Sequence, residues 1–196
     1  MRLNNWSTVI AGALVLSTAT LLAACTGSAG DPLTSTTSVT SGPPATPTAS
    51  PTPPIDPTLA AAESAILVAY RGYWAVKVAI LADTTVDPGA ELDTYAVDTA
   101  RAGVLETLLT YRTNRIDMVG APVLHPAVSD IVPGAEGTAT ITDCVDVTDW
   151  QPIFRDTKKP AAAPGQATRV RSTSSAYFFD GRWTVRSYEV DRGAQC

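Results

Sequence analysis

The sequence predicts an α+β domain in which helices pack on one face of a curved antiparallel sheet. Apolar residues recur at helical spacing over residues 60–82 and again over residues 92–113. After Asn114 the pattern changes to alternating apolar and polar residues in segments rich in β-branched side chains. Two helices followed by a run of strands is an order typical of α+β domains.

The first predicted helix spans residues 60–82, and its apolar side chains cover most of its circumference. They are Ala62, Ile66, Leu67, Ala69, Tyr70, Tyr73, Trp74, Val76, Val78, Ile80 and Leu81. So wide an apolar surface predicts a helix that lies in the core. For Tyr70, Tyr73 and Trp74 two interpretations stay open, namely core packing and the lining of a cavity mouth.

The second predicted helix spans residues 92–113 and follows a turn at Asp87-Pro88-Gly89. One face carries apolar residues at helical spacing: Val97, Ala100, Val104, Leu108 and Tyr111. Gly103 lies within this helix and indicates either a kink or close packing against another element.

Five segments are predicted to be strands. They are residues 116–120, 122–132, 137–148, 167–179 and 182–190. Asp180-Gly181 separates the last two and predicts a two-residue hairpin turn, because glycine readily adopts the positive φ that such turns require. Residues 149–166 form a long connection that carries Trp150 and Phe154, which either bind a partner or cap one end of the sheet.

The N-terminus has the features of a bacterial export signal. Arg2 precedes an apolar run over residues 9–24, and Leu22-Ala23-Ala24-Cys25 resembles the lipobox, where cleavage precedes a lipidated cysteine. Residues 1–24 are therefore predicted to be a lipoprotein signal peptide and Cys25 the acylated residue. A transmembrane anchor is the alternative, but the run is shorter than the roughly 20 residues that a spanning helix needs.

Residues 25–58 are predicted to be a stalk, and residues 59–196 the folded domain. The stalk is nearly all Ser, Thr, Pro, Gly and Ala, a composition that cannot bury enough apolar surface to fold. Its hydroxyl groups could carry glycans. The expected location is thus extracytoplasmic, with the domain held at the cell membrane by lipid.

The three cysteines divide between two roles. If Cys25 is lipidated, Cys144 and Cys196 remain in an oxidising compartment, where a disulfide is expected and two free thiols or a metal pair are the alternatives. The chain has one histidine, His125, and no third ligand at a characteristic spacing, which argues against a metal site. The formal net charge of −5 argues against a nucleic-acid partner.

Short motifs in the domain resemble the secreted NTF2-like, or SnoaL-like, domains of actinobacterial lipoproteins. They are Tyr70-Arg71-Gly72-Tyr73-Trp74, Asp87-Pro88, Asp143-Cys144-Val145-Asp146, Asp180-Gly181-Arg182-Trp183-Thr184-Val185 and the terminal cysteine. The resemblance implies a cone whose curved sheet and helices enclose a cavity, and a bridge between Cys144 and Cys196. It implies no single activity, since the fold hosts enzymes, ligand binders and interaction modules.

Asp143 is the best candidate for a catalytic carboxylate. It shares strand parity with Ala139, Ile141, Val145 and Val147, which predicts that it lies on the apolar face. The alternative interpretation is that Asp143 accepts bonds from arginines, a tyrosine or backbone amides. His125 is predicted to lie on a strand or sheet edge, and a lone histidine is more often a surface or hydrogen-bonded residue than a catalyst.

The leading expectation is a non-enzymatic domain of the cell envelope that binds a small apolar ligand or an envelope protein. No nucleophile or cofactor-binding motif is visible, and a homodimer through the exposed sheet stays open. The alternative is a ketosteroid-isomerase-like or dehydratase-like enzyme with Asp143 as base and Tyr70 or Tyr73 as donor. A purely structural module with a filled cone is a third possibility.

Overall fold

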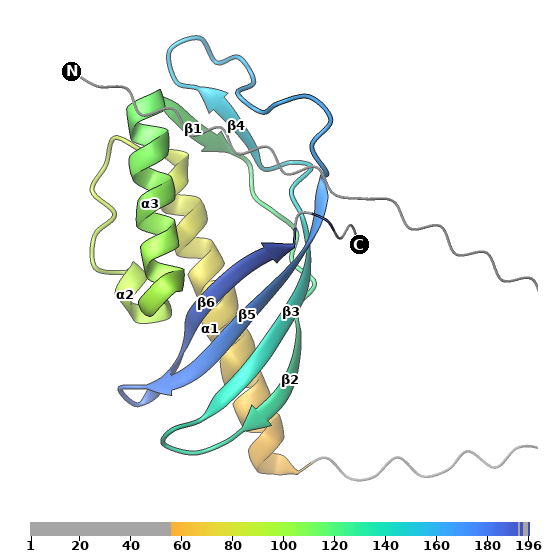
Figure 1. Cartoon of the computed structure of the whole chain (residues 1–196). Coiled ribbons are helices and arrows are strands. Elements are labelled where there is room, and N and C mark those ends of the chain that lie inside the picture. The colour runs from red at the N-terminus through yellow and green to blue at the C-terminus, as the bar shows by residue number, and fades with distance from the viewer. Residues whose placement is uncertain (1–55, 192, 194–195) are drawn as a thin grey trace, which may run out of the picture. The chain divides into compact units, whose positions relative to one another are not determined.

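A long helix, α1 (Pro57–Ala82), lies across one face of a four-stranded antiparallel sheet in the computed structural model (Figure 1). The structure describes residues 56–191, 193 and 196. The predicted signal peptide, Cys25 and the predicted stalk up to residue 55 lie outside these described residues. The α+β class predicted from the sequence is confirmed for the domain.

Helix α1 begins three residues earlier than predicted, because Asp56 caps it. The Asp56 carboxylate accepts a hydrogen bond from the backbone N–H of Thr58 at 2.8 Å, and Pro57 occupies the first helical position. Proline is favoured there since that N–H has no partner within a helix. Within the described residues, α1 is the one helix long and apolar enough to cross a membrane. Its buried face packs on the sheet, as in the core helix of a globular domain.

The prediction of a single helix over residues 92–113 is wrong. The chain forms a short helix, α2 (Leu92–Tyr95), breaks at Ala96 and Val97, and resumes as α3 (Asp98–Asn114). At the break Ala96 forms a parallel bridge with Val185, and the Val97 N–H donates to the Val185 carbonyl at 3.0 Å. Pairing with a distant strand therefore replaces helical hydrogen bonds.

Gly103 of α3 marks no close packing, since a Cβ there would meet nothing within 4 Å.

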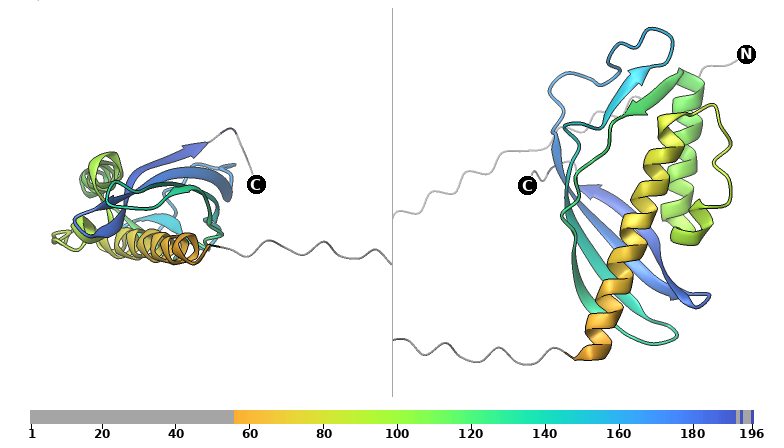
Figure 2. Two further views of the ribbon diagram at one scale, coloured as in Figure 1. Left: turned by 90° about the horizontal axis from the view of Figure 1, so that it is seen from below. Right: turned by 180° about the vertical axis from the view of Figure 1, so that it is seen from behind.

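The main sheet has the strand order β2-β3-β5-β6, all antiparallel. Its strands are β2 (Ala127–Val132), β3 (Thr138–Asp146), β5 (Arg169–Phe179) and β6 (Arg182–Asp191). Asp180 and Gly181 both have positive φ, at 50° and 76°, and close the predicted β5–β6 hairpin. Seen from behind, α1 and α3 lie side by side on the same face of this sheet (Figure 2).

A second sheet of two strands corrects two predictions. Strand β1 (Ile116–Val119) pairs with β4 (Gln151–Phe154), which lies inside the segment predicted to be a loop. The strand predicted over residues 122–132 is shorter, because its first part forms only an isolated bridge at Val123. His125 consequently precedes β2 and is not in a strand.

Cys144 and Cys196 lie at disulfide distance, with their Cα atoms 5.9 Å apart. Cys144 belongs to β3, near the centre of the sheet order, and Cys196 ends the chain. A bond between them ties the residues after β6 to an inner strand.

Candidate functional site

A cavity of about 660 Å³ lies between α1, α3 and the ends of the sheet strands. Its floor is formed by buried or half-buried side chains: Tyr73, Trp74, Lys77, Leu81, Ala100, Val147, Trp150, Val170, Tyr188 and Val190. Its rim is more polar and more exposed, with Thr99, Gly103, Glu106, Thr107 and Thr110 from α3 and Gln166 from the β4–β5 connection. This volume lies in the range of small-molecule sites, and the lining combines an aromatic floor with a polar rim.

Lys77 lies in this floor, surrounded by aromatic rings from three parts of the chain. Its Nζ is 4.3 Å from the ring centres of Trp74 and Tyr188. It is also 5.7 Å from the Tyr73 ring and 5.8 Å from the Trp150 ring. The rings themselves pack edge to face, as in the Trp74–Trp150 pair at 5.5 Å. Such cation–π contacts offset part of the cost of burying an ammonium group.

The Lys77 side chain is buried without a compensating carboxylate. Lys77 is 9% exposed, and no acidic group in the described part of the chain lies within ion-pair distance of it. Burial lowers the pKa of Lys77 to about 8, because the charged amine is deprived of water. A buried, unpaired lysine that faces a cavity is unusual, since lysine is almost never fully buried unless it is paired.

Three of the five residues predicted to bind a ligand line this cavity: Tyr73, Trp74 and Trp150. Tyr70 is fully buried in the core, one turn before Trp74 on the same face of α1, and does not line the cavity, and Phe154 is 42% exposed on β4. The structure therefore brings together aromatic residues that are separated by more than seventy positions in the sequence.

Sequence reasoning missed Lys77, Tyr188 and Gly103. Lys77 follows Tyr73 by four residues and precedes Leu81 by four, so it shares the apolar stripe of α1. A lysine in the middle of such a stripe is the signal that could have identified it. Gly103 lies at the rim with open space beside its Cα, which leaves the cavity mouth uncovered by α3 at this position.

Asp143 is buried, as its strand parity predicted, but it does not line the cavity. Its Oδ2 accepts a hydrogen bond from the Tyr70 hydroxyl at 3.0 Å, and its Oδ1 accepts one from the His125 backbone N–H at 2.7 Å. The His125 ring lies outside this pair, with Nδ1 3.1 Å from the Cys144 carbonyl oxygen. Both carboxylate oxygens are thus occupied by groups that fix the fold.

Burial raises the pKa of Asp143, while the bonds from His125 and Tyr70 oppose that shift. Burial and the neighbouring Asp143 charge also raise the pKa of the Tyr70 hydroxyl. Shifted titration of this kind is common at catalytic sites, but buried structural networks show it as well. Because neither side chain lines the cavity, a substrate bound there would not meet this pair.

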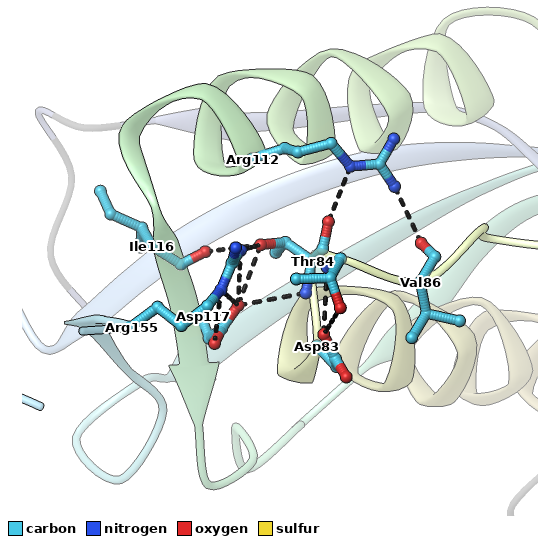
Figure 3. Close-up of polar contacts among 8 residues, drawn as sticks. Asp83, Thr84, Val86, Arg112, Ile116, Asp117 and Arg155 are labelled. Atoms are coloured by element: carbon cyan, nitrogen blue, oxygen red, sulfur yellow. Dashed lines mark hydrogen bonds and ion pairs between the residues drawn. The ribbon is translucent and has the colours of Figure 1, made fainter.

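A separate polar cluster fastens the β1–β4 sheet to the end of α1 (Figure 3). Asp117 Oδ1 accepts bonds from the Thr84 N–H at 3.1 Å and the Thr84 hydroxyl at 2.9 Å, and the Arg155 guanidinium lies 3.2 Å away. Arg155 also contacts the Thr84 hydroxyl, and Arg112 donates to the carbonyls of Thr84 and Val86. Every donor and acceptor named here has a partner within the cluster, as expected for a structural network.

Burial alone would raise the pKa of Asp117, but the bonds from Arg155 and Thr84 outweigh it. They hold the pKa of Asp117 below its usual range.

Within the described residues, no group of three His, Cys, Asp or Glu side chains is arranged to hold a metal ion.

Comparison with known proteins gives little on which to base a function. No protein-family model matches the sequence. No curated protein matches it either. Among solved structures, the intermembrane space region of the chloroplast protein ARC6 is similar over 70% of this chain and 98% of that chain, with 9% identity and a TM-score of 0.39. A likeness this weak supports no inference about function.

Proposed function

We propose that this chain is a lipid-anchored, extracytoplasmic binding protein that takes up a small ligand in the cavity between α1, α3 and the sheet. The observation that carries the proposal is the cavity itself, with its aromatic floor, its polar rim and its unpaired lysine. Its volume of about 660 Å³ lies in the range of drug-sized ligand sites. In this proposal the domain is an NTF2-like cone that is open to ligand.

The location rests on the N-terminal sequence. An apolar run that ends in Leu22-Ala23-Ala24-Cys25, followed by a Ser/Thr/Pro-rich segment, supports export, lipidation and a spacer between the membrane and the domain. Two or more acyl chains hold a protein at a bilayer stably, whereas one chain binds only marginally.

An enzymatic function receives less support from the geometry. Proton transfer would need Asp143 or another carboxylate within reach of a bound substrate. Asp143 and Tyr70 are hydrogen-bonded to each other in the core and lie outside the cavity lining. The one acidic side chain in that lining, Glu106, is exposed at the rim and is not part of the buried floor.

Ligand binding is tested by native mass spectrometry of the protein purified from its own envelope. The expected result is an additional mass that is removed by mild organic extraction. A Gly103→Phe variant, purified in the same way, should lose that mass because the new ring fills the open space at the rim. A wild-type spectrum identical to that of Gly103→Phe would contradict ligand uptake in this cavity.

Anchoring is tested by metabolic labelling with a fatty acid. Wild-type protein should incorporate label and stay with the membrane fraction, and Cys25→Ala should incorporate none and lose stable membrane association. Normal labelling of Cys25→Ala would show that the acyl chains are attached elsewhere.

A further inference from the structure

We propose that the cavity recognises an organic acid, a molecule with an apolar body and one acidic group, whose negative charge lies against Lys77. This inference rests on the proposed ligand-binding function and specifies the chemistry of the ligand. It stands on the geometry of the cavity floor, where a buried amine and aromatic rings meet.

The first step of the argument is the unbalanced charge on the floor. Only 9% of the surface of Lys77 is exposed. Within the described residues, no carboxylate lies within 4.0 Å of its Nζ. Removing a charge from water without a counter-charge is costly, and the cost falls sharply when an opposite charge binds. An acidic ligand would supply the counter-charge that the fold lacks.

The second step is the surplus of hydrogen-bond donors. Trp150 lines the cavity, and its buried indole N–H has no acceptor in the described part of the protein. The Lys77 ammonium group carries donors but no acceptor, as does an indole N–H. A group rich in acceptor oxygens, such as a carboxylate or sulfonate, is the chemistry that complements such a floor.

The third step is the rest of the wall. Four aromatic rings, those of Tyr73, Trp74, Trp150 and Tyr188, surround the amine, and aliphatic side chains extend the floor. These surfaces suit an aromatic ring or an acyl chain, since aromatic and aliphatic side chains form most of the lining in apolar ligand sites. The ligand therefore combines an apolar body with a single acidic head, rather than being a polyanion.

Glu106 is the one acidic side chain in the lining, and it lies on the exposed part of the rim. The chain as a whole is also acidic, with a formal net charge of −5. An anion is thus not attracted by the overall field of the protein. The electrostatic part of its affinity therefore has to come from Lys77, so a single substitution of Lys77 tests the inference.

The experiment titrates two fluorescent probes of matching shape into the mature chain, produced without its acyl chains, in detergent-free buffer at pH 7. One is 1-anilinonaphthalene-8-sulfonate, which carries an acidic group, and the other is the uncharged N-phenyl-1-naphthylamine. Dissociation constants are measured by fluorescence titration for wild type, Lys77→Met and the control Lys159→Met. Methionine keeps the apolar stem of Lys77 without its charge, and Lys159 is exposed and is not among the residues that line the cavity.

Lys77→Met should weaken binding of the sulfonate by about tenfold to a hundredfold, the loss expected for a charge-assisted contact. Binding of the uncharged probe should change by less than about threefold, which also shows that the cavity is intact. Lys159→Met should leave both constants unchanged. Equal effects of Lys77→Met on the two probes would overturn the inference about the acid while leaving ligand binding in place.

Gly103→Phe separates failure of the inference from failure of the proposed function. This substitution should weaken the binding of both probes, because both enter the cavity past the rim. If neither probe binds wild type, or if Gly103→Phe affects neither, the proposed cavity function itself is wrong.

A measurement on wild type avoids dependence on the folding of the variants. Acetylation of lysines by a limiting amount of acetic anhydride, followed by peptide mass spectrometry, reports access to each amine. The sulfonate should protect Lys77 at least about threefold more than the uncharged probe does at equal occupancy. Lys158 and Lys159 should show no protection, and protection of Lys77 by both probes alike would overturn the role of charge.

Discussion

The Tyr70 hydroxyl donates a hydrogen bond to Asp143 Oδ2 at 3.0 Å and so joins the middle of α1 to an inner strand of the sheet. Both residues are buried, with 0% and 3% of their surfaces exposed. The bond therefore fixes how the long helix is seated on the sheet.

Tyr70→Phe is expected to lower the free energy of unfolding by about 1–3 kcal/mol at pH 7. The change leaves a buried carboxylate oxygen without its donor, and that loss exceeds the worth of an exposed hydrogen bond. Urea unfolding measures the difference, with Tyr95→Phe as a control that removes a hydroxyl for which the described residues show no hydrogen bond. Equal effects of the two substitutions would contradict this role of Tyr70.

The effect of Tyr70→Phe should shrink at low pH. Burial raises the pKa of Asp143, so its carboxyl is protonated in the folded protein at a pH where it is still ionised in the unfolded chain. The stability that this group contributes is present at low pH and is lost as pH rises through the pKa of the folded state. Unfolding curves for wild type and variant should therefore converge on acidification, and a gap that widens instead would contradict this titration.

Lys77→Met is expected to raise the free energy of unfolding at pH 7, by up to about 3 kcal/mol. The pKa of Lys77 falls from 10.5 to about 8 on folding, which means that the charged form is destabilised by burial. Methionine fills the same space without that cost, although it loses the cation–π contacts with Trp74 and Tyr188. Thermal melts of the two proteins at pH 7 measure the gain.

The gain should disappear at alkaline pH. Between about pH 8 and 10.5 the unfolded chain holds the Lys77 proton and the folded chain has released it, so the stability of wild type rises with pH through this window. The Lys77→Met variant lacks this rise. A difference that stays constant from pH 7 to pH 10 would contradict the lowered pKa.

Asp117→Asn is expected to lower the free energy of unfolding by about 1–3 kcal/mol. The new amide N–H atoms would face the Arg155 guanidinium, which Asp117 now neutralises at 3.2 Å. Asp156→Asn is the matched control, because its pair with Arg115 is exposed, with 51% of the Asp156 side chain accessible against 11% for Asp117. The control should change stability by less than about 0.5 kcal/mol.

The Asp117 contribution should depend on pH in the direction opposite to that of Asp143. The pKa of Asp117 is lowered in the folded protein, so its stabilisation is present above the pKa of an ordinary aspartate and is lost as pH falls through the folded value. Chemical unfolding at pH 7 and near pH 3 should show a smaller gap between wild type and Asp117→Asn in acid. An unchanged gap would argue against the ion pair as its source.

Two helical glycines should respond in opposite ways to alanine. A Cβ at Gly72 of α1 would overlap the ring of Tyr95 from α2, whereas a Cβ at Gly103 of α3 would meet nothing within 4 Å. Gly103→Ala should raise the free energy of unfolding by about 0.5–1 kcal/mol, the difference in helix propensity. Gly72→Ala should lower it by about 1 kcal/mol because Tyr95 has to move. Stabilisation by both changes would mean that α2 packs on α1 less closely than described.

Local patterns in the sequence predicted the α+β class, the extent of α1 within three residues, the β5–β6 hairpin and the burial of Asp143. Each depends on spacing within one element, where the periods of 3.6 and 2 decide which side chains face inward. The break in the helix at Ala96 was not predicted, because it depends on a bridge to Val185, some ninety residues later in the sequence. Strand β4 was missed for a similar reason, since its pairing with β1 is also between distant segments.

Three of the four rings around Lys77 were among the candidate binding residues predicted from the sequence: Tyr73, Trp74 and Trp150. For Tyr73 and Trp74 the sequence left core packing and the lining of a cavity open, and in the structure both residues are buried and line the cavity. The fourth ring, Tyr188, comes from the last strand, and no local pattern places it beside α1. Lys77 was not predicted as a site residue. A single lysine in an apolar stripe can be paired with a carboxylate of another element or left unpaired, and the sequence alone does not show which.

The position of Lys77 along α1 sets its distance from the N-terminal end of the domain. Twenty residues separate it from Pro57, and at 1.5 Å per residue the helix carries the amine about 30 Å from its own first turn. A chain immobilised on a sensor surface or a bead through the residues before Pro57 would therefore hold Lys77 about 30 Å along α1 from the first described turn of the domain.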